Sequence, residues 1–61
     1  MNIMNMENGT KLRHKKTGTT YLLGEYVNDE ARVLYNQKYL CMTDYINENT
    51  QEDYEVVQND F

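Results

Sequence analysis

The chain has no proline or tryptophan, and it has only one cysteine, one histidine and one phenylalanine. A single cysteine excludes an internal disulfide, and the lone cysteine and histidine cannot supply the ligands of a structural zinc site. No apolar run approaches the ~18 residues that identify a membrane-spanning helix. The 61 residues therefore cannot be stabilised by an internal disulfide or by a structural zinc site. We expect one marginally stable domain with one apolar core.

The N-terminal segment has neither the basic region nor the apolar stretch of a secretory signal. We interpret residues 1–9 as a flexible lead, residues 10–58 as one small β-barrel domain and residues 59–61 as a frayed C-terminus. A free thiol without a disulfide is typical of a reducing compartment. Together these features predict a cytoplasmic protein that does not contact a membrane.

Charge is unevenly distributed along the chain, although the net charge of −4 is modest. Four of the six basic residues lie between Lys11 and Lys16, and no basic residue follows Lys38. Six of the ten acidic residues occur from Asp44 onward. Such asymmetry can steer charged partners, but it does not indicate a fold.

Alternating and β-branched residues, separated by polar turns, predict five short strands. Gly18 fits the left-handed position that ends a three-residue hairpin loop, and Gly24 fits a bulge in the second strand. The expected strands span residues 11–16, 19–27, 31–35, 38–42 and 54–57.

One short helical turn is expected between the fourth and fifth strands. Thr43 or Asp44 can cap it, because both side chains offer an acceptor to free N–H groups of a first turn. The turn itself spans Tyr45 and Ile46, and the polar residues 47–53 form a surface loop. Five strands with tight turns favour a mostly β fold that closes into a small antiparallel barrel, since isolated hairpins are not stable alone.

The turn lengths predict which side chains share a face of the sheet. If residues 36–37 form a two-residue loop, Val33 lies opposite Leu40. The outer face of this hairpin then carries Arg32, Leu34, Tyr39 and Cys41. The expected interior contains Leu12, Leu22, Val33, Leu40, Met42 and Val56.

The run Lys11-Leu-Arg-His-Lys-Lys-Thr-Gly-Thr-Thr-Tyr21, followed by Val33-Leu34-Tyr35, resembles short bacterial and phage proteins of unknown function. Those proteins open with an Arg-His-x-Lys-x-Gly-x-x-Tyr hairpin, continue with a Val-x-Tyr strand and end in an acidic strand. The resemblance implies an SH3-like barrel and a phage or bacterial origin, with a host cytoplasm as the location if a phage encodes the chain. Leu40-Cys-Met-Thr43 departs from the aromatic-x-Arg-Pro element of the related proteins, and no activity carries over from them.

Residues that could perform chemistry are few. His14 is the only candidate general base and Cys41 the only thiol, and the expected faces keep the two apart. The carboxylates between Asp44 and Asp53 lack the spacing and the central glycine of a calcium loop. We therefore expect no enzymatic activity, no cofactor and no metal site.

A nucleic-acid surface is one alternative. With Lys15 opposite Thr19, Arg13 falls opposite Tyr21, and the four residues Lys11, Arg13, Lys15 and Tyr21 share one face. Small barrels bind single strands by such a combination of charge and aromatic stacking. The acidic net charge nevertheless predicts weak and salt-dependent binding.

A protein-contact surface is the favoured interpretation. Six tyrosines exceed what one small core can bury with satisfied hydroxyl groups. On the outer face, Arg32, Leu34 and Tyr39 form the expected contact surface, which a foreign protein or a second copy in a homodimer would cover. The sequence therefore predicts a non-enzymatic protein-interaction module. A more specific hypothesis is a small inhibitor of a host protein that imitates nucleic acid with its acidic C-terminal half.

Overall fold

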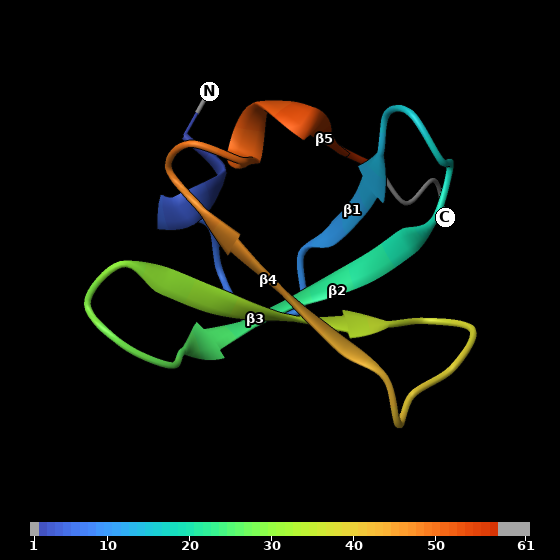
Figure 1. Ribbon diagram of the computed structural model, residues 1–61, viewed down its shortest axis with the longest axis horizontal. Coiled ribbons are helices and arrows are strands. Elements are labelled where there is room, and N and C mark those ends of the chain that lie inside the picture. Colours follow the sequence, from blue (N-terminus) through green and yellow to red (C-terminus); the bar gives the residue numbers. More distant parts are fainter. Residues whose placement is uncertain (1, 58–61) are drawn as a thin grey trace.

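Five antiparallel strands form one curled sheet in the computed structural model, which describes residues 2–57 (Figure 1). The strand order is β4-β3-β2-β1-β5, so β4 and β5 are the two edges of a half-barrel. This confirms the predicted fold class, a small mostly β protein with five antiparallel strands. The elements are η1 (Ile3–Asn5), β1 (Lys11–His14), β2 (Thr20–Tyr26), β3 (Ala31–Asn36), β4 (Thr43–Asn47), η2 (Gln51–Asp53) and β5 (Tyr54–Val56), where η denotes a 3-10 turn.

The hairpin between β1 and β2 has a loop that is one residue longer than predicted. The His14 N–H donates to the Thr19 carbonyl (2.8 Å), so the four residues 15–18 form the loop. Gly18 takes the predicted left-handed conformation, with a φ of +76°.

The longer loop moves the register of β1 against β2 by one residue. Arg13 pairs with Thr20, and Leu12 pairs with Tyr21, whereas a three-residue loop predicts Arg13 opposite Tyr21. Directly paired residues share a face of the sheet, and a slip of one residue exchanges the faces. Because Leu12 is completely buried, Tyr21 lies on the core side and not on the predicted basic face.

β4 begins at Thr43, which corrects the predicted strand over residues 38–42. The Asn36 side-chain oxygen accepts hydrogen bonds from the N–H groups of Lys38 (2.8 Å) and Tyr39 (2.9 Å), an Asx turn that directs the chain away from the sheet. Residues 37–42 therefore form a long exposed loop. The register resumes with Thr43 opposite Tyr35.

The predicted helical turn before the last strand exists, but it lies at Gln51–Asp53. Residues 45–46, where it was expected, belong to β4. The polar segment 47–53 connects β4 to β5, as expected, and contains this turn in its second half. The turn was misplaced because Thr43 and Asp44 have the composition of a helix cap, while pairing with β3 determines their conformation.

The core differs from the predicted interior at several positions. Leu12 is buried as expected, and Val56 packs against the core. Val33 is buried on the opposite face of the sheet, while Leu40 and Met42 are 70% and 57% exposed. The observed core contains Ile3, Met4, Leu12, Leu23, Leu34, Ile46 and Tyr54.

Gly24 produces the predicted irregularity in β2. The register of β2 against β3 shifts between Leu23 and Tyr26, as a bulge requires. A Cβ atom at Gly24 would lie 2.5 Å from side-chain atoms of both Tyr35 and Val33. Glycine is therefore needed because these two side chains cover the strand at this point.

The N-terminal segment is part of the folded domain, which corrects the prediction of a flexible lead over residues 1–9. Ile3 and Met4 are each 4% exposed and belong to the core. The Gly9 N–H donates to the Leu23 carbonyl (2.7 Å), so the segment joins the sheet beside β2. We call residues 2–8 the strap. The expected frayed end, residues 59–61, lies outside the described residues.

Candidate functional site

Arg32 fastens the strap to the sheet. Its side chain leaves β3 toward the core side, and the residue is only 4% exposed. Nε donates to the Gly24 carbonyl (2.8 Å), Nη1 donates to the carbonyls of Met4 (3.0 Å) and Met6 (2.5 Å), and Nη2 donates to Asn8 Oδ1 (2.5 Å). All of these acceptors are neutral. Arg32 thus satisfies its donors through oxygen atoms of the strap and of β2, which offsets the cost of burying the charge.

Tyr26 supports the same contact from the end of β2. Its hydroxyl donates to the Met4 carbonyl (2.9 Å), and the Arg32 guanidinium lies 5.3 Å from the centre of its ring. Gln51 accepts the Met4 N–H from the other side (3.3 Å). The main chain at Met4 is therefore held on both sides, by β2 and β3 and by the segment before β5.

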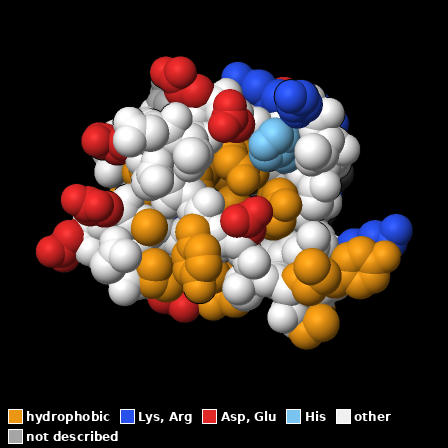
Figure 2. All heavy atoms as spheres, viewed as in Figure 1, with side chains coloured by type: hydrophobic (Ala, Val, Ile, Leu, Met, Phe, Trp, Pro, Cys, Tyr) orange, Lys and Arg blue, Asp and Glu red, His pale blue; other side chains and the backbone are white. Residues whose placement is uncertain are grey.

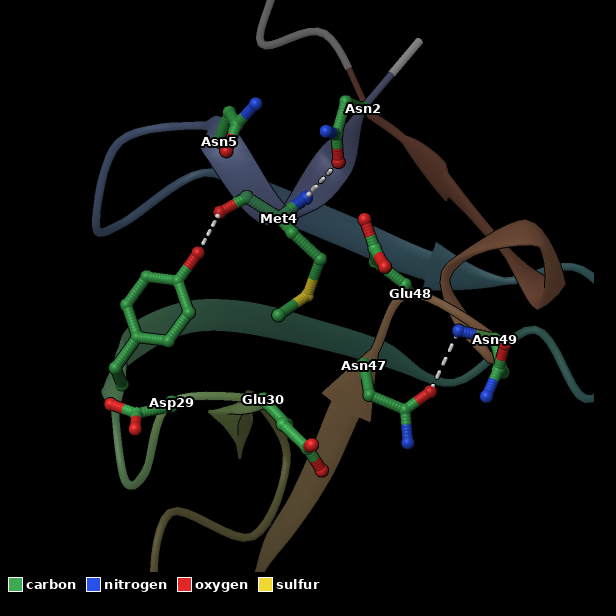
Figure 3. Close-up of a pocket in the computed structure, with 9 residues that line it drawn as sticks. Asn2, Met4, Asn5, Asp29, Glu30, Asn47, Glu48 and Asn49 are labelled. Atoms are coloured by element: carbon green, nitrogen blue, oxygen red, sulfur yellow. Dashed lines mark hydrogen bonds between the residues drawn. The ribbon is translucent and has the colours of Figure 1, made fainter.

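An acidic hollow opens beside the strap (Figure 3). It has a volume of about 420 Å³ and lies between the strap, the β2–β3 turn and the loop after β4. Asp29, Glu30 and Glu48 provide its carboxylates, and the Met4 side chain points toward its centre in Figure 3. The hollow combines residues that are distant in the sequence.

The β3–β4 loop, residues 37–42, forms an exposed apolar tip at the opposite end of the sheet. The side chains of Tyr39, Leu40 and Met42 are half exposed or more, and Cys41 is exposed as well. The Lys38 ammonium lies 5.4 Å from the centre of the Tyr39 ring. Figure 2 shows hydrophobic side chains and a basic one protruding at the corner where Figure 1 places this loop.

Three aromatic rings, those of His14, Tyr21 and Tyr54, meet near the Asp44 carboxylate. The His14 ring contacts Tyr54 edge-on at 4.9 Å, and Tyr21 contacts Tyr54 at 5.9 Å. Burial, with a further contribution from the Asp44 carboxylate, raises the pKa of Tyr54 to about 12 and also raises the pKa of Tyr21. These tyrosines act as neutral core residues.

His14 and Cys41 lie on different elements, and the contacts of the His14 ring are with other groups. His14 Nδ1 accepts hydrogen bonds from the N–H groups of Lys16 (3.2 Å) and Thr17 (3.3 Å), so this nitrogen stabilises the hairpin loop. Cys41 lies in the exposed β3–β4 loop, on a different element from His14.

Two of the three predicted protein-contact residues lie inside the molecule. Leu34 is completely buried and Arg32 is 4% exposed, whereas Tyr39 is 52% exposed. The predicted surface of Arg32, Leu34 and Tyr39 therefore does not exist as one face. The error follows from the misplaced fourth strand, because the assumed pairing assigned Leu34 to the outer face.

The predicted nucleic-acid surface is divided between two faces. Tyr21 lies on the core side, opposite Leu12. Arg13 Nε and Nη2 donate to Glu55 Oε2 at 3.0 and 2.9 Å, so its charge is paired. Lys11 and Lys15 are left without the stacking partner on which the hypothesis depended.

The described acidic residues from Asp44 onward have several different surroundings, and Asp44 and Asp53 both lie near Tyr54. Glu55 pairs with Arg13, and Glu48 borders the acidic hollow. Asp60 lies outside the described residues. The hollow instead combines Glu48 with acids of the β2–β3 turn.

Leu40, Met42 and Lys38 are the surface residues that the sequence analysis missed. The signal that could have found them is Asn36, whose side chain can end a strand by an Asx turn. The following apolar run has the composition of a strand, and its exposure depends on that turn.

Within residues 2–57, no three His, Cys, Asp or Glu side chains are grouped closely enough to hold a metal ion. No helix in this part of the chain is both long and apolar enough to cross a membrane. No family model matches the chain, and no curated protein or solved structure matches it significantly.

Proposed function

We propose that the protein is a non-enzymatic protein-interaction module that binds a partner through the β3–β4 loop. The observation that carries this proposal is the exposure of Tyr39, Leu40 and Met42 on one short loop, at 52%, 70% and 57%. Apolar side chains gathered on a surface favour contact with another protein, and loops carried by a rigid sheet are common binding elements. Aromatic residues and methionine are enriched in the centres of such contacts.

Side chains, and not the edge of the sheet, are the expected means of contact. The main-chain groups of Tyr45 and Asn47 face away from β3 at the open edge of β4. The Tyr45 N–H already donates to Asp44 Oδ1 (2.8 Å), and the Asn47 N–H donates to Thr50 Oγ1 (3.0 Å). Because two donors of this edge are occupied, it is a poorer template for a further strand.

The loop also indicates the chemistry of the partner. Lys38 is the only charged residue of the segment 37–42. A complementary surface would offer an apolar pocket with a carboxylate at its border, because charge complementarity aligns two partners. A partner in a phage or bacterial host is a narrower form of this proposal, and it rests only on the resemblance of the β1–β2 hairpin and of Val33-Leu34-Tyr35 in β3.

Affinity capture from source cells with matched variants tests the proposal. The double substitution Tyr39→Ala and Leu40→Ser removes the centre of the tip, while Val27→Ser removes a similarly exposed apolar side chain from the β2–β3 turn. We expect the double variant to lose a captured protein that the wild type and Val27→Ser retain. Equal capture by all three proteins contradicts the proposal.

Thermal unfolding of the same variants is the necessary control. All three substituted side chains are at least half exposed, so each change should alter stability by no more than about 0.5 kcal/mol. Loss of capture with unchanged unfolding then reports on binding. If the double variant loses capture and also unfolds, the result would instead show that the loop contributes to the stability of the domain.

A further inference from the structure

We propose that the groove occupied by the strap also accepts the strap of a second copy, so that two chains form a dimer by exchanging residues 2–8. This inference is independent of the proposed function, because it concerns the strap and not the β3–β4 loop. The groove lies between β2, β3 and the segment that includes Gln51, and its occupant is visible in the structure.

The groove recognises the strap mainly through main-chain atoms and two apolar side chains. Arg32 and Tyr26 donate to strap carbonyls, and Gln51 accepts the Met4 N–H. Ile3 and Met4 fill the core. None of these contacts requires that the strap belong to the same chain, so an identical segment from a neighbour would make the same ones. Exchange of an identical element is a low-cost route to a dimer for this reason.

A single turn connects the strap to β1 and can act as the hinge. The Glu7 carbonyl accepts hydrogen bonds from the Thr10 N–H (3.2 Å) and the Thr10 hydroxyl (2.7 Å), which closes the turn. Gly9 within it has a φ of +90°. Straightening the hinge therefore requires the loss of these two local hydrogen bonds and a change of φ at Gly9, which also displaces the N–H that Gly9 donates to the Leu23 carbonyl.

The concentration at which exchange should appear depends on the short turn that joins the strap to β1. A segment joined by a short flexible connection has an effective concentration in the millimolar range, on the order of 1 mM. The wild-type chain should therefore be monomeric in dilute solution and form exchanged dimers near that concentration. A substitution that disfavours only the closed hinge should lower the required concentration.

Gly9→Ala is such a substitution, and Gly18→Ala is its matched control. Both glycines have positive φ, and a Cβ atom at either would have no neighbour within 4 Å, so both changes introduce backbone strain alone. Only Gly9 is at the hinge. In the Gly9→Ala variant, the strain is relieved when the hinge extends. Each of the two hinges in a dimer should then favour exchange about tenfold, so the association constant should rise about a hundredfold.

Each protein is refolded from denaturant at rising protein concentrations, up to about the effective concentration of the strap within its own chain. Its mass is then measured by light scattering. Isotope-filtered nuclear Overhauser spectra of a mixture of labelled and unlabelled chains then show which residues cross between copies. We expect Gly9→Ala to dimerise at lower concentration than the wild type, and Gly18→Ala to behave as the wild type. Dimers should show intermolecular contacts from Ile3 and Met4 to Leu34 and Ile46.

Three results would overturn the proposal. The first is a wild-type protein that stays monomeric across the whole range. The second is a dimer in which Ile3 and Met4 contact only their own chain. The third is an equal increase in dimer for both glycine variants, because the effect would then come from general destabilisation. If Gly9→Ala does not fold, the wild-type spectra alone still decide between exchange and its absence.

Discussion

The strap and the β3–β4 loop use similar residues in opposite ways. Both regions contain methionine, and each involves a tyrosine ring beside a cation. Tyr26 and Arg32, from β2 and β3, hold the strap, whereas Tyr39 and Lys38 belong to the loop itself. Arg32 is buried and donates four hydrogen bonds, whereas Lys38 and Tyr39 are both exposed. The strap therefore completes the fold, while the loop adds apolar surface that the fold does not need. This difference makes the loop the better candidate for function.

The largest expected effect comes from removing the arginine that fastens the strap. Arg32→Met should lower the free energy of unfolding by about 3–5 kcal/mol, because each buried acceptor that loses its donor costs about 1–3 kcal/mol. Arg13→Met removes a half-exposed arginine paired with Glu55 and should cost less than about 1 kcal/mol. Urea denaturation of both variants provides the measurement. Equal costs would mean that Arg32 does not anchor the strap.

Alanine substitutions of two leucines compare packing in the core with packing in the β3–β4 loop. Leu34→Ala should destabilise the protein by about 2–5 kcal/mol, since it leaves a cavity in the core. Leu40 is 70% exposed, and Leu40→Ala should change stability by no more than about 0.5 kcal/mol. The midpoints of thermal unfolding distinguish the two. A large effect at Leu40 would show that the loop packs against the domain.

The pH dependence of stability above neutrality is a third way to compare the buried part of the molecule with the exposed part. The pKa of Tyr54 is about 12 in the folded protein and 10.0 as the reference value. Because the folded state favours the protonated phenol, its stabilising contribution is complete below pH 10 and is lost as the pH rises through about 12. Unfolding measured across this range should show that loss, and Tyr54→Phe should remove this part of the pH dependence. An unchanged profile in the variant would contradict the assignment.

The substitution with the smallest expected effect strengthens the contact between the strap and Arg32. Asn8→Asp would place a carboxylate at the Arg32 Nη2 group that now donates to an amide oxygen. A guanidinium–carboxylate pair is stronger than the present bond from the guanidinium to a neutral amide, but Asn8 is exposed, so the free energy of unfolding should rise by no more than about 1 kcal/mol at neutral pH. The gain should disappear in acid, where the introduced carboxylate is protonated. Asn8→Ala is the control and should lower stability; a carboxylate variant no more stable than this control would contradict the prediction.

The part of the fold that local chemistry controls could be predicted from the sequence. Gly18 was assigned to a left-handed turn, which few other residues tolerate, and Gly24 was assigned to a bulge; both assignments are confirmed. The composition also predicted five antiparallel strands and a helical turn before the last one. Turns and strand composition are local features, whereas the pairing of β1 with β5 joins residues at least 40 positions apart.

The candidate site could not be predicted in the same way, because it depends on strand register and on long-range contacts. One additional loop residue placed Tyr21 on the core side, and one Asx turn at Asn36 exposed the run that follows it. Alternation along a strand makes each such slip exchange the two faces. The predicted contact residues were therefore divided between core and surface.

The amino-acid sequence by itself determined the class of fold, the left-handed turn at Gly18 and the lack of an internal disulfide. Only the tertiary structure decided that Arg32 is buried, that Ile3 and Met4 belong to the core and that the β3–β4 loop is exposed. The physical reason is that an arginine can enter a core only where several acceptors converge, and here they come from segments 8 to 28 residues away.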